Sequence, residues 1–164
     1  MNTEKIHRNV VIKAIENKLK DNENVYALWL EGADGLNCVD EYSDIDFVVD
    51  VEDGSEEEIF NLAEEALGAL GDIDVNHRMK HGHPKMRQKV YHIKNSSEYL
   101  LIDFCIQSHS RDISEGVFVK GDMVEAPKVI FDKDNIVRFG DEQELNKEEL
   151  RERIYELKGR YEQH

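Results

Sequence analysis

Three aspartates have the residue type and spacing of a metal site. Asp44 and Asp46 are separated by one residue in the segment 44–51, which predicts a strand, so their side chains leave the same face about 7 Å apart. Asp103 lies between apolar residues, where an ionised carboxylate is costly unless it is paired, metal-bound or at an open edge. If the two strands are neighbours, the three carboxylates converge. Oxygen ligands of this kind suit Mg²⁺, and two such ions promote in-line displacement at phosphorus. The alternative is that the acids only face water at the end of a strand.

A run of basic residues between 77 and 92 reverses the charge locally in a chain whose net charge is −15. Cations of this kind stabilise the charge that develops during phosphoryl transfer. We therefore predict that His83, Lys85 and Arg87 contact phosphate groups or another part of a substrate. The alternative is a solvated basic loop that balances the acidic helices.

The other residues with chemical potential give narrower indications. Cys38 and Cys105 lie far apart and have no Cys-x-x-Cys partner, so neither a zinc site nor a disulfide scaffold is indicated. We assign Trp29, in the first apolar strand, to the core. His109 and Arg111 follow the strand of Asp103 and extend the indication of phosphate or substrate contact.

The elements that position these residues in the first half of the chain alternate between helical and strand patterns. Apolar residues recur at helical spacing over 3–20, with Thr3 as the N-cap, and again over 56–70. Short apolar segments at 25–31 and 44–51 predict two strands on either side of a glycine-bearing loop. The aspartate pair then begins the second strand.

Strands dominate the second half of the chain up to residue 140. We predict strands over 72–79, 88–94 and 98–107, a loop over 108–126, and a hairpin of 128–132 with 136–139 joined by Asp134 and Asn135. A charged helix from 147 to about 162 follows, which could dock on this domain, pair with a partner or begin a helical domain. The sequence thus predicts an α+β (mixed α/β) domain over 1–140, a mixed sheet flanked by helices, and a C-terminal helix within 141–164.

Composition restricts the class of protein. With 164 residues and 40% hydrophobic content, the chain can form one compact domain with a core. No apolar segment reaches the length of a membrane span and no signal peptide is evident, so we expect a soluble cytosolic protein that does not bind membranes. The net charge of −15 argues against a nucleic-acid partner, because such binding depends on clustered Lys and Arg.

Together these motifs resemble the signature of the polymerase-beta-like nucleotidyltransferase superfamily. The matching segments are LEGAD at 30–34, YSDIDFVV at 42–49 and the isolated acid at Asp103. The family's signature is a strand ending in Gly-Ser, a loop, Asp-x-Asp in the next strand, and later a lone acid between hydrophobic residues. The resemblance extends over 5–107, including the two helices, and is closest to small bacterial enzymes that adenylylate antibiotics or other small acceptors.

The resemblance implies a role for each matching position. Asp44 and Asp46 would bind two Mg²⁺ ions and, through them, ATP or another nucleoside triphosphate. Asp103 would complete the metal site and help to deprotonate the attacking hydroxyl. Gly32 and Ala33 would present backbone N–H groups to the β- and γ-phosphates.

One position departs from the family's pattern. Ala33 replaces the serine that follows the glycine, so a hydroxyl that holds a phosphate oxygen is missing, and Ser43 or the backbone would have to compensate. Asp34 is an unfavourable neighbour for a triphosphate unless it points away or meets a cation.

We therefore expect a Mg²⁺-dependent nucleotidyltransferase, a phosphorus-group transferase acting as an adenylyltransferase. It would move AMP from ATP to a hydroxyl of a small-molecule acceptor, such as a cationic antibiotic. The alternative is an antitoxin-like or degenerate nucleotide-sensing module that acts through a protein partner, which Ala33 favours. A third hypothesis, a domain whose acids only solvate a strand end, leaves the basic run and the loop spacing unexplained.

Overall fold

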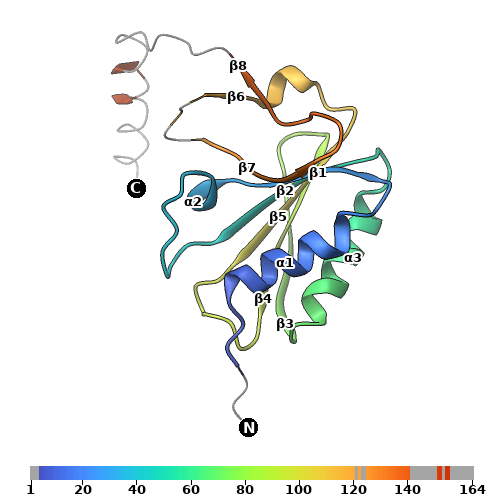
Figure 1. The fold of residues 1–164 in the computed structure, drawn as a ribbon, viewed down its shortest axis with the longest axis vertical. Helices are drawn as coiled ribbons and strands as arrows, with labels where there is room; N and C mark the ends of the chain where they lie inside the picture. The colour runs from blue at the N-terminus through green and yellow to red at the C-terminus, as the bar shows by residue number, and fades with distance from the viewer. Residues whose placement is uncertain (1–3, 121, 123–124, 141–150, 153, 156–164) are drawn as a thin grey trace.

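The computed structural model describes residues 4–120, 122, 125–140, 151–152 and 154–155, and a six-stranded sheet forms its centre (Figure 1). The strand order is β3-β4-β5-β2-β1-β7. Strands β2 and β5 pair in parallel, and the other neighbouring strands pair antiparallel. The prediction of an α+β fold with a mixed sheet is confirmed. The six strands are β1 (Val25–Leu30), β2 (Ile45–Val51), β3 (Ile73–Met79), β4 (Met86–Ile93), β5 (Ile102–Ser108) and β7 (Lys128–Asp132).

Two helices, α1 (Arg8–Leu19) and α3 (Glu56–Gly68), lie side by side on one face of the sheet (Figure 1). Because side chains alternate between the faces of a strand, every second residue of β2 and β5 points toward these helices and is fully buried. These residues form the main core with the apolar faces of α1 and α3; its largest members include Phe47, Phe104, Ile106, Ile15, Leu19, Phe60 and Leu67.

A smaller layer covers part of the opposite face of the sheet. It consists of the short helix η1 (Ile113–Gly116) and the parallel strands β6 (Val117–Val119) and β8 (Arg138–Gly140). A second apolar cluster joins this layer to the sheet, and it contains Ala27, Trp29, Val48, Cys105 and Val137 with Met86, Phe118 and Ile136 against it. The sheet therefore separates a large core under the helices from a small one under the β6–β8 layer.

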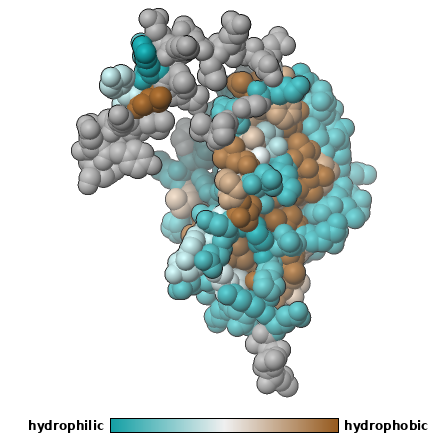
Figure 2. Space-filling model, turned by 60° about the vertical axis from the view of Figure 1, so that its left-hand side comes forward, coloured by the Kyte–Doolittle hydropathy of each residue, from teal (hydrophilic) through white to brown (hydrophobic). Residues whose placement is uncertain are grey.

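The molecular surface is mainly hydrophilic, as expected from the charge. Figure 2 shows one side on which hydrophobic residues gather in the middle, between hydrophilic margins. Several apolar side chains of the outer strands are exposed, including Val117, Val129 and Phe139. None of the helices in the described part of the chain is long and apolar enough to span a membrane.

Several element boundaries differ from the prediction. The first helix begins at Arg8 rather than near residue 3, and the strand predicted over 98–107 begins only at Ile102. A short helix, α2 (Gly32–Gly35), was not expected. Part of the predicted loop 108–126 forms η1 and β6.

The predicted hairpin at 128–132 and 136–139 is wrong. Strand β7 pairs with the outer edge of β1, and β8 pairs with β6 in the other layer. The turn residues Asp134 and Asn135 are compatible with a hairpin, but the sheet offers β7 a longer partner that local turn chemistry does not reveal. Most of the predicted C-terminal helix lies outside the described residues, so the boundary at 140/141 stays a prediction.

Candidate active site

The parallel pairing of β2 and β5 brings two of the three predicted acids together. Asp46 and Asp103 are register partners, and both line the face of the sheet opposite α1 and α3. Asp44 immediately precedes β2, and its charge acts on both Asp46 and Asp103. The expectation that the two strands are neighbours is confirmed, and it brings Asp46 and Asp103 together on this face.

Gly32 places the turn after β1 directly against Asp46. Its φ is +60°, a region that L side chains rarely adopt, and a Cβ atom there would overlap the Asp46 carboxylate. The chain at this turn is tied to β2, because the Glu31 N–H donates to the Asp46 carbonyl at 2.9 Å. A residue larger than glycine would therefore displace either the turn or the acid.

Burial and mutual repulsion favour the protonated forms of these acids. Burial, the nearby Asp103 and Asp44 together raise the pKa of Asp46 to about 6. Burial also raises the pKa of Asp103, although a hydrogen bond from Gln88 opposes the shift. Glu31, missed in the sequence because its strand pattern looked apolar, adds a fourth carboxyl whose pKa is raised by burial. A cation at this place would relieve the repulsion.

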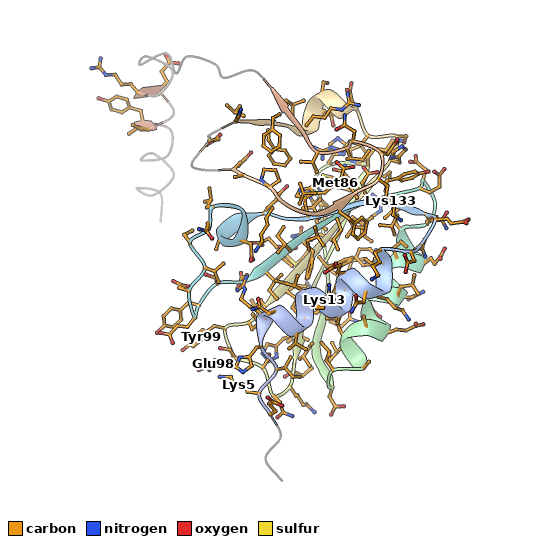
Figure 3. The ribbon with its side chains drawn as sticks, in the orientation of Figure 1. Lys5, Lys13, Met86, Glu98, Tyr99 and Lys133 are labelled. Carbon is orange, nitrogen blue, oxygen red and sulfur yellow. The ribbon has the colours of Figure 1, made fainter. Side chains whose placement is uncertain are left out.

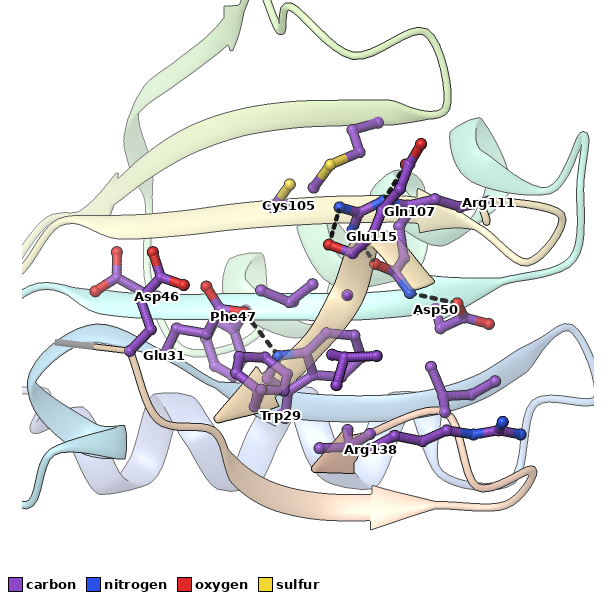
Figure 4. A pocket seen from close by; sticks show the side chains of 18 of the residues that line it. Trp29, Glu31, Asp46, Phe47, Asp50, Cys105, Gln107, Arg111, Glu115 and Arg138 are labelled. Atoms are coloured by element: carbon purple, nitrogen blue, oxygen red, sulfur yellow. Dashed lines mark hydrogen bonds and ion pairs between the residues drawn. The ribbon is translucent and has the colours of Figure 1, made fainter. Parts of the chain in front are cut away.

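A cavity of about 630 Å³ extends from these acids along the sheet, beneath the β6–β8 layer (Figure 4). At the acidic end, Trp29 Nε1 donates to Glu31 at 2.9 Å, and Gln88 Nε2 donates to both carboxylate oxygens of Asp103 at 2.7 Å. Apolar side chains from the second core, including Trp29 and Cys105, line the middle. Burial raises the pKa of the Cys105 thiol to about 12, so it stays protonated.

The other end of the cavity contains a hydrogen-bonded network. Asp50 is 2% exposed and accepts from Gln107 Nε2 and from the His109 ring at 2.6 Å each. Arg111 donates to Gln107 Oε1 at 2.8 Å, and its Nε–H donates to Glu115 at 3.4 Å. Asp50 and Gln107 were not predicted, although their spacing of four residues from Asp46 and Asp103 puts them on the same face.

The three basic residues predicted to contact phosphates lie elsewhere. His83 pairs with Glu115 at 2.8 Å, Lys85 pairs with Asp53 at 3.3 Å, and Arg87 donates to backbone carbonyls. None of the three lines the cavity, whereas His81 and Gln88 do. Arg87 lies on β4 next to Gln88, so its side chain points to the opposite face of the sheet, whereas His83 and Lys85 lie in the turn before β4. Their role in nucleotide binding stays a prediction.

The loop residues around the missing serine have partners of their own. Asp34, which the sequence left as an unfavourable neighbour of a triphosphate, is buried and forms an ion pair with Arg8. Ser43 Oγ donates to Asp40 at 2.7 Å and does not line the cavity. Arg8 therefore neutralises the charge of Asp34. Ser43 does not supply the hydroxyl that is missing at Ala33.

The donor set fits magnesium by its chemistry, since the carboxylates of Asp44, Asp46 and Asp103 are hard oxygen ligands. Within the described residues, however, no three His, Cys, Asp or Glu side chains are grouped so that they could hold a metal ion. Asp103 is turned to Gln88. A divalent ion would have to replace Gln88 as the partner of Asp103.

Neither a protein-family model nor a curated protein matches the chain.

Proposed function

We propose that the chain is a Mg²⁺-dependent nucleotidyltransferase of the polymerase-beta-like type that transfers AMP from ATP to a hydroxyl of a small molecule. The observation that carries the proposal is the register pairing of Asp46 with Asp103 on parallel strands, beside Gly32 and at the mouth of a cavity. Carboxylates that repel each other in a partly buried site are suited to divalent ions.

Each acid has a distinct role in this proposal. Asp44 and Asp46 would hold the metal ions, and Asp103 would complete the site if it were released from Gln88. Bound there, such ions would supply positive charge against the phosphates of the nucleotide. The turn at Gly32 keeps the backbone close to Asp46, so that phosphates bound there lie within reach of the same acids.

The transfer step breaks one bond to the α-phosphorus and forms another. The acceptor oxygen attacks this phosphorus, the bond to the β-bridging oxygen breaks, and pyrophosphate leaves with that electron pair. Asp103 accepts the hydroxyl proton, consistent with a pKa raised by burial. The cavity beneath the β6–β8 layer offers room for the organic part of the substrates.

Thermal unfolding with Mg²⁺ and each nucleoside triphosphate tests the proposal. A ligand at about one hundred times its dissociation constant adds roughly 2.7 kcal/mol to the free energy of unfolding. We expect this stabilisation in wild type and not in the variant Asp44→Asn/Asp46→Asn. Asp72→Asn, at a side chain 83% exposed, is the matched control. Absence of any triphosphate effect in wild type would contradict the proposal.

A nucleotide-sensing module acting through a protein partner is a second candidate. Two observations favour it: Ala33 lacks the family's hydroxyl, and Gln88 engages both oxygens of Asp103. Pyrophosphate release separates the two functions. A transferase releases pyrophosphate when MgATP and a suitable hydroxyl acceptor are present, and the rate falls in Asp103→Asn. A sensor binds MgATP with the same thermal shift and releases none with any acceptor.

A further inference from the structure

Arg8, the first residue of α1, joins the two ends of the loop that connects β1 to β2. Its guanidinium forms an ion pair with Asp34, which lies two residues beyond Gly32. The same group donates to the carbonyl of Ser43 at 2.9 Å and to that of Asp44 at 3.1 Å. One side chain thus contacts both the turn beside the acids and the segment that begins β2.

The contact is largely shielded from water. The side chain of Arg8 is 16% exposed and that of Asp34 is 4% exposed. In the described part of the chain, the Arg8 Nε–H is buried without a hydrogen-bond partner. The two terminal nitrogens of the guanidinium make all three hydrogen bonds, to Asp34 and to the two carbonyls. A buried, paired charge of this kind is strongly destabilising to break.

The backbone hydrogen bonds of the loop are local on each side. The N–H groups of Leu36, Asn37 and Cys38 donate within the turn of α2, and Ser43 N–H donates to Asp40. Arg8 connects these two local turns, and its rigid fork of donors sets the separation between them. The carbonyls it holds belong to Asp44 and to the residue before it.

We propose that Arg8 is a positioning residue for the acidic site: it fixes Asp44 and the Gly32 turn relative to one another. The inference rests on the proposed function. Arg8 reaches the carbonyl rather than the carboxylate of Asp44, so it orients the acid without competing for its oxygens. Residues that orient metal ligands are worth about 10- to 100-fold in metal affinity or activity.

The single tryptophan of the chain supplies a readout at the site. Trp29 lines the cavity and donates to Glu31, so quenching of its fluorescence by Mn²⁺ reports divalent-ion binding. The variants are Arg8→Lys, which keeps the charge but loses the fork, and Asp34→Asn, which keeps the shape of the ion-pair partner. Lys13→Ala is the control, because Lys13 lies on the same helix with a side chain 61% exposed (Figure 3).

We expect the half-maximal Mn²⁺ and MgATP concentrations to rise about tenfold or more in Arg8→Lys, and less in Asp34→Asn. Lys13→Ala should match wild type. All titrations are made below the thermal transition of each variant, where a purely stabilising residue would leave these concentrations unchanged. If Arg8→Lys does not fold, Asp34→Asn decides the outcome.

Two results remain distinguishable. If wild type binds Mn²⁺ and MgATP and the folded variants bind them equally well, Arg8 is not a positioning residue and the proposed function stands. If wild type binds neither, the proposed function fails and this inference with it.

Discussion

At the scale of single residues, Asp46 lies where its negative charge is disfavoured. Its carboxyl is partly buried on the cavity face of β2 and faces Asp103 and Asp44, and its pKa is raised to about 6. Burial is the largest cause of this shift, and repulsion from Asp103 and Asp44 adds to it. A cation bound beside Asp46 would relieve that repulsion.

This environment predicts a pH dependence of stability. Because the folded state raises the pKa of Asp46 from 3.8 to about 6, its contribution to stability is present at low pH and is lost as pH rises through about 6. In buffer without divalent ions, we expect the free energy of unfolding of Asp46→Asn, relative to that of wild type, to rise by about 1–2 kcal/mol from pH 4 to pH 8. Urea unfolding at both pH values measures this difference. A constant difference would contradict the assigned pKa.

Gly32 gives a second prediction at this scale. Ala at this position combines strain at positive φ with overlap of the Asp46 carboxylate, so Gly32→Ala should lose the thermal shift with Mg²⁺ and ATP. Gly54 also has positive φ, 91°, but open space around it. Gly54→Ala should therefore cost only the backbone strain, about 1–2 kcal/mol, and keep the shift. Equal ligand responses in both variants would show that contact with Asp46 is unimportant.

At the scale of elements, His109 connects the sheet to the segment after β7. One ring nitrogen contacts Asp50 at 2.6 Å and the other lies 3.3 Å from Asp134, while the ring stacks on Tyr26. Burial lowers the pKa of His109, but Asp50 and the surrounding acids outweigh it, so the pKa is raised. Only the imidazolium can donate to both carboxylates.

The free energy of unfolding should therefore depend on this charge. His109→Phe keeps a ring to stack on Tyr26 but loses both carboxylate contacts, and we expect a loss of about 2 kcal/mol at pH 6. The loss should shrink at pH 9, because the stabilisation by a raised histidine pKa disappears as pH rises through the folded value. His92→Phe should cost less than His109→Phe, because its carboxylate partner Asp74 is 34% exposed, whereas Asp50 is 3% exposed. A larger effect at pH 9 than at pH 6 would refute this account.

At the scale of the whole molecule, the net charge of −15 makes any salt stabilising to some degree. Screening by NaCl reduces repulsion throughout the protein, so an effect of MgCl₂ has meaning only at constant ionic strength. Comparing MgCl₂ with NaCl at the same ionic strength separates ion binding at the acidic site from general screening of charge.

We expect NaCl to raise the unfolding temperature of wild type and of Asp44→Asn/Asp46→Asn by similar amounts. MgCl₂ at the same ionic strength should stabilise wild type further and leave the double variant unchanged, because only the wild-type acids can bind the ion. Differential scanning fluorimetry measures both. Equal responses to MgCl₂ would reduce the magnesium effect to screening.

Sequence patterns predicted β1 from a short apolar run, and they predicted the face of Asp46 from a local period of two. They did not predict the pairing of β7 with β1 or the layer of β6 and β8, since strand partners depend on which sheet edge is available. The basic residues His83, Lys85 and Arg87 show the same limit. Charge is visible in the sequence, but the strand face of Arg87 and the acids that pair with His83 and Lys85 decide which cations reach the cavity.

The sequence alone determined the residue types of the acidic site and the spacing that sets Asp44, Asp46 and Asp103 near strand ends. The tertiary structure decided what surrounds them. Parallel register makes Asp103 the partner of Asp46, Arg8 neutralises Asp34 from a distant helix, and Gln88 occupies Asp103. These contacts join residues far apart in the chain, and their energies depend on burial, which exists only after the sheet and its two layers have assembled.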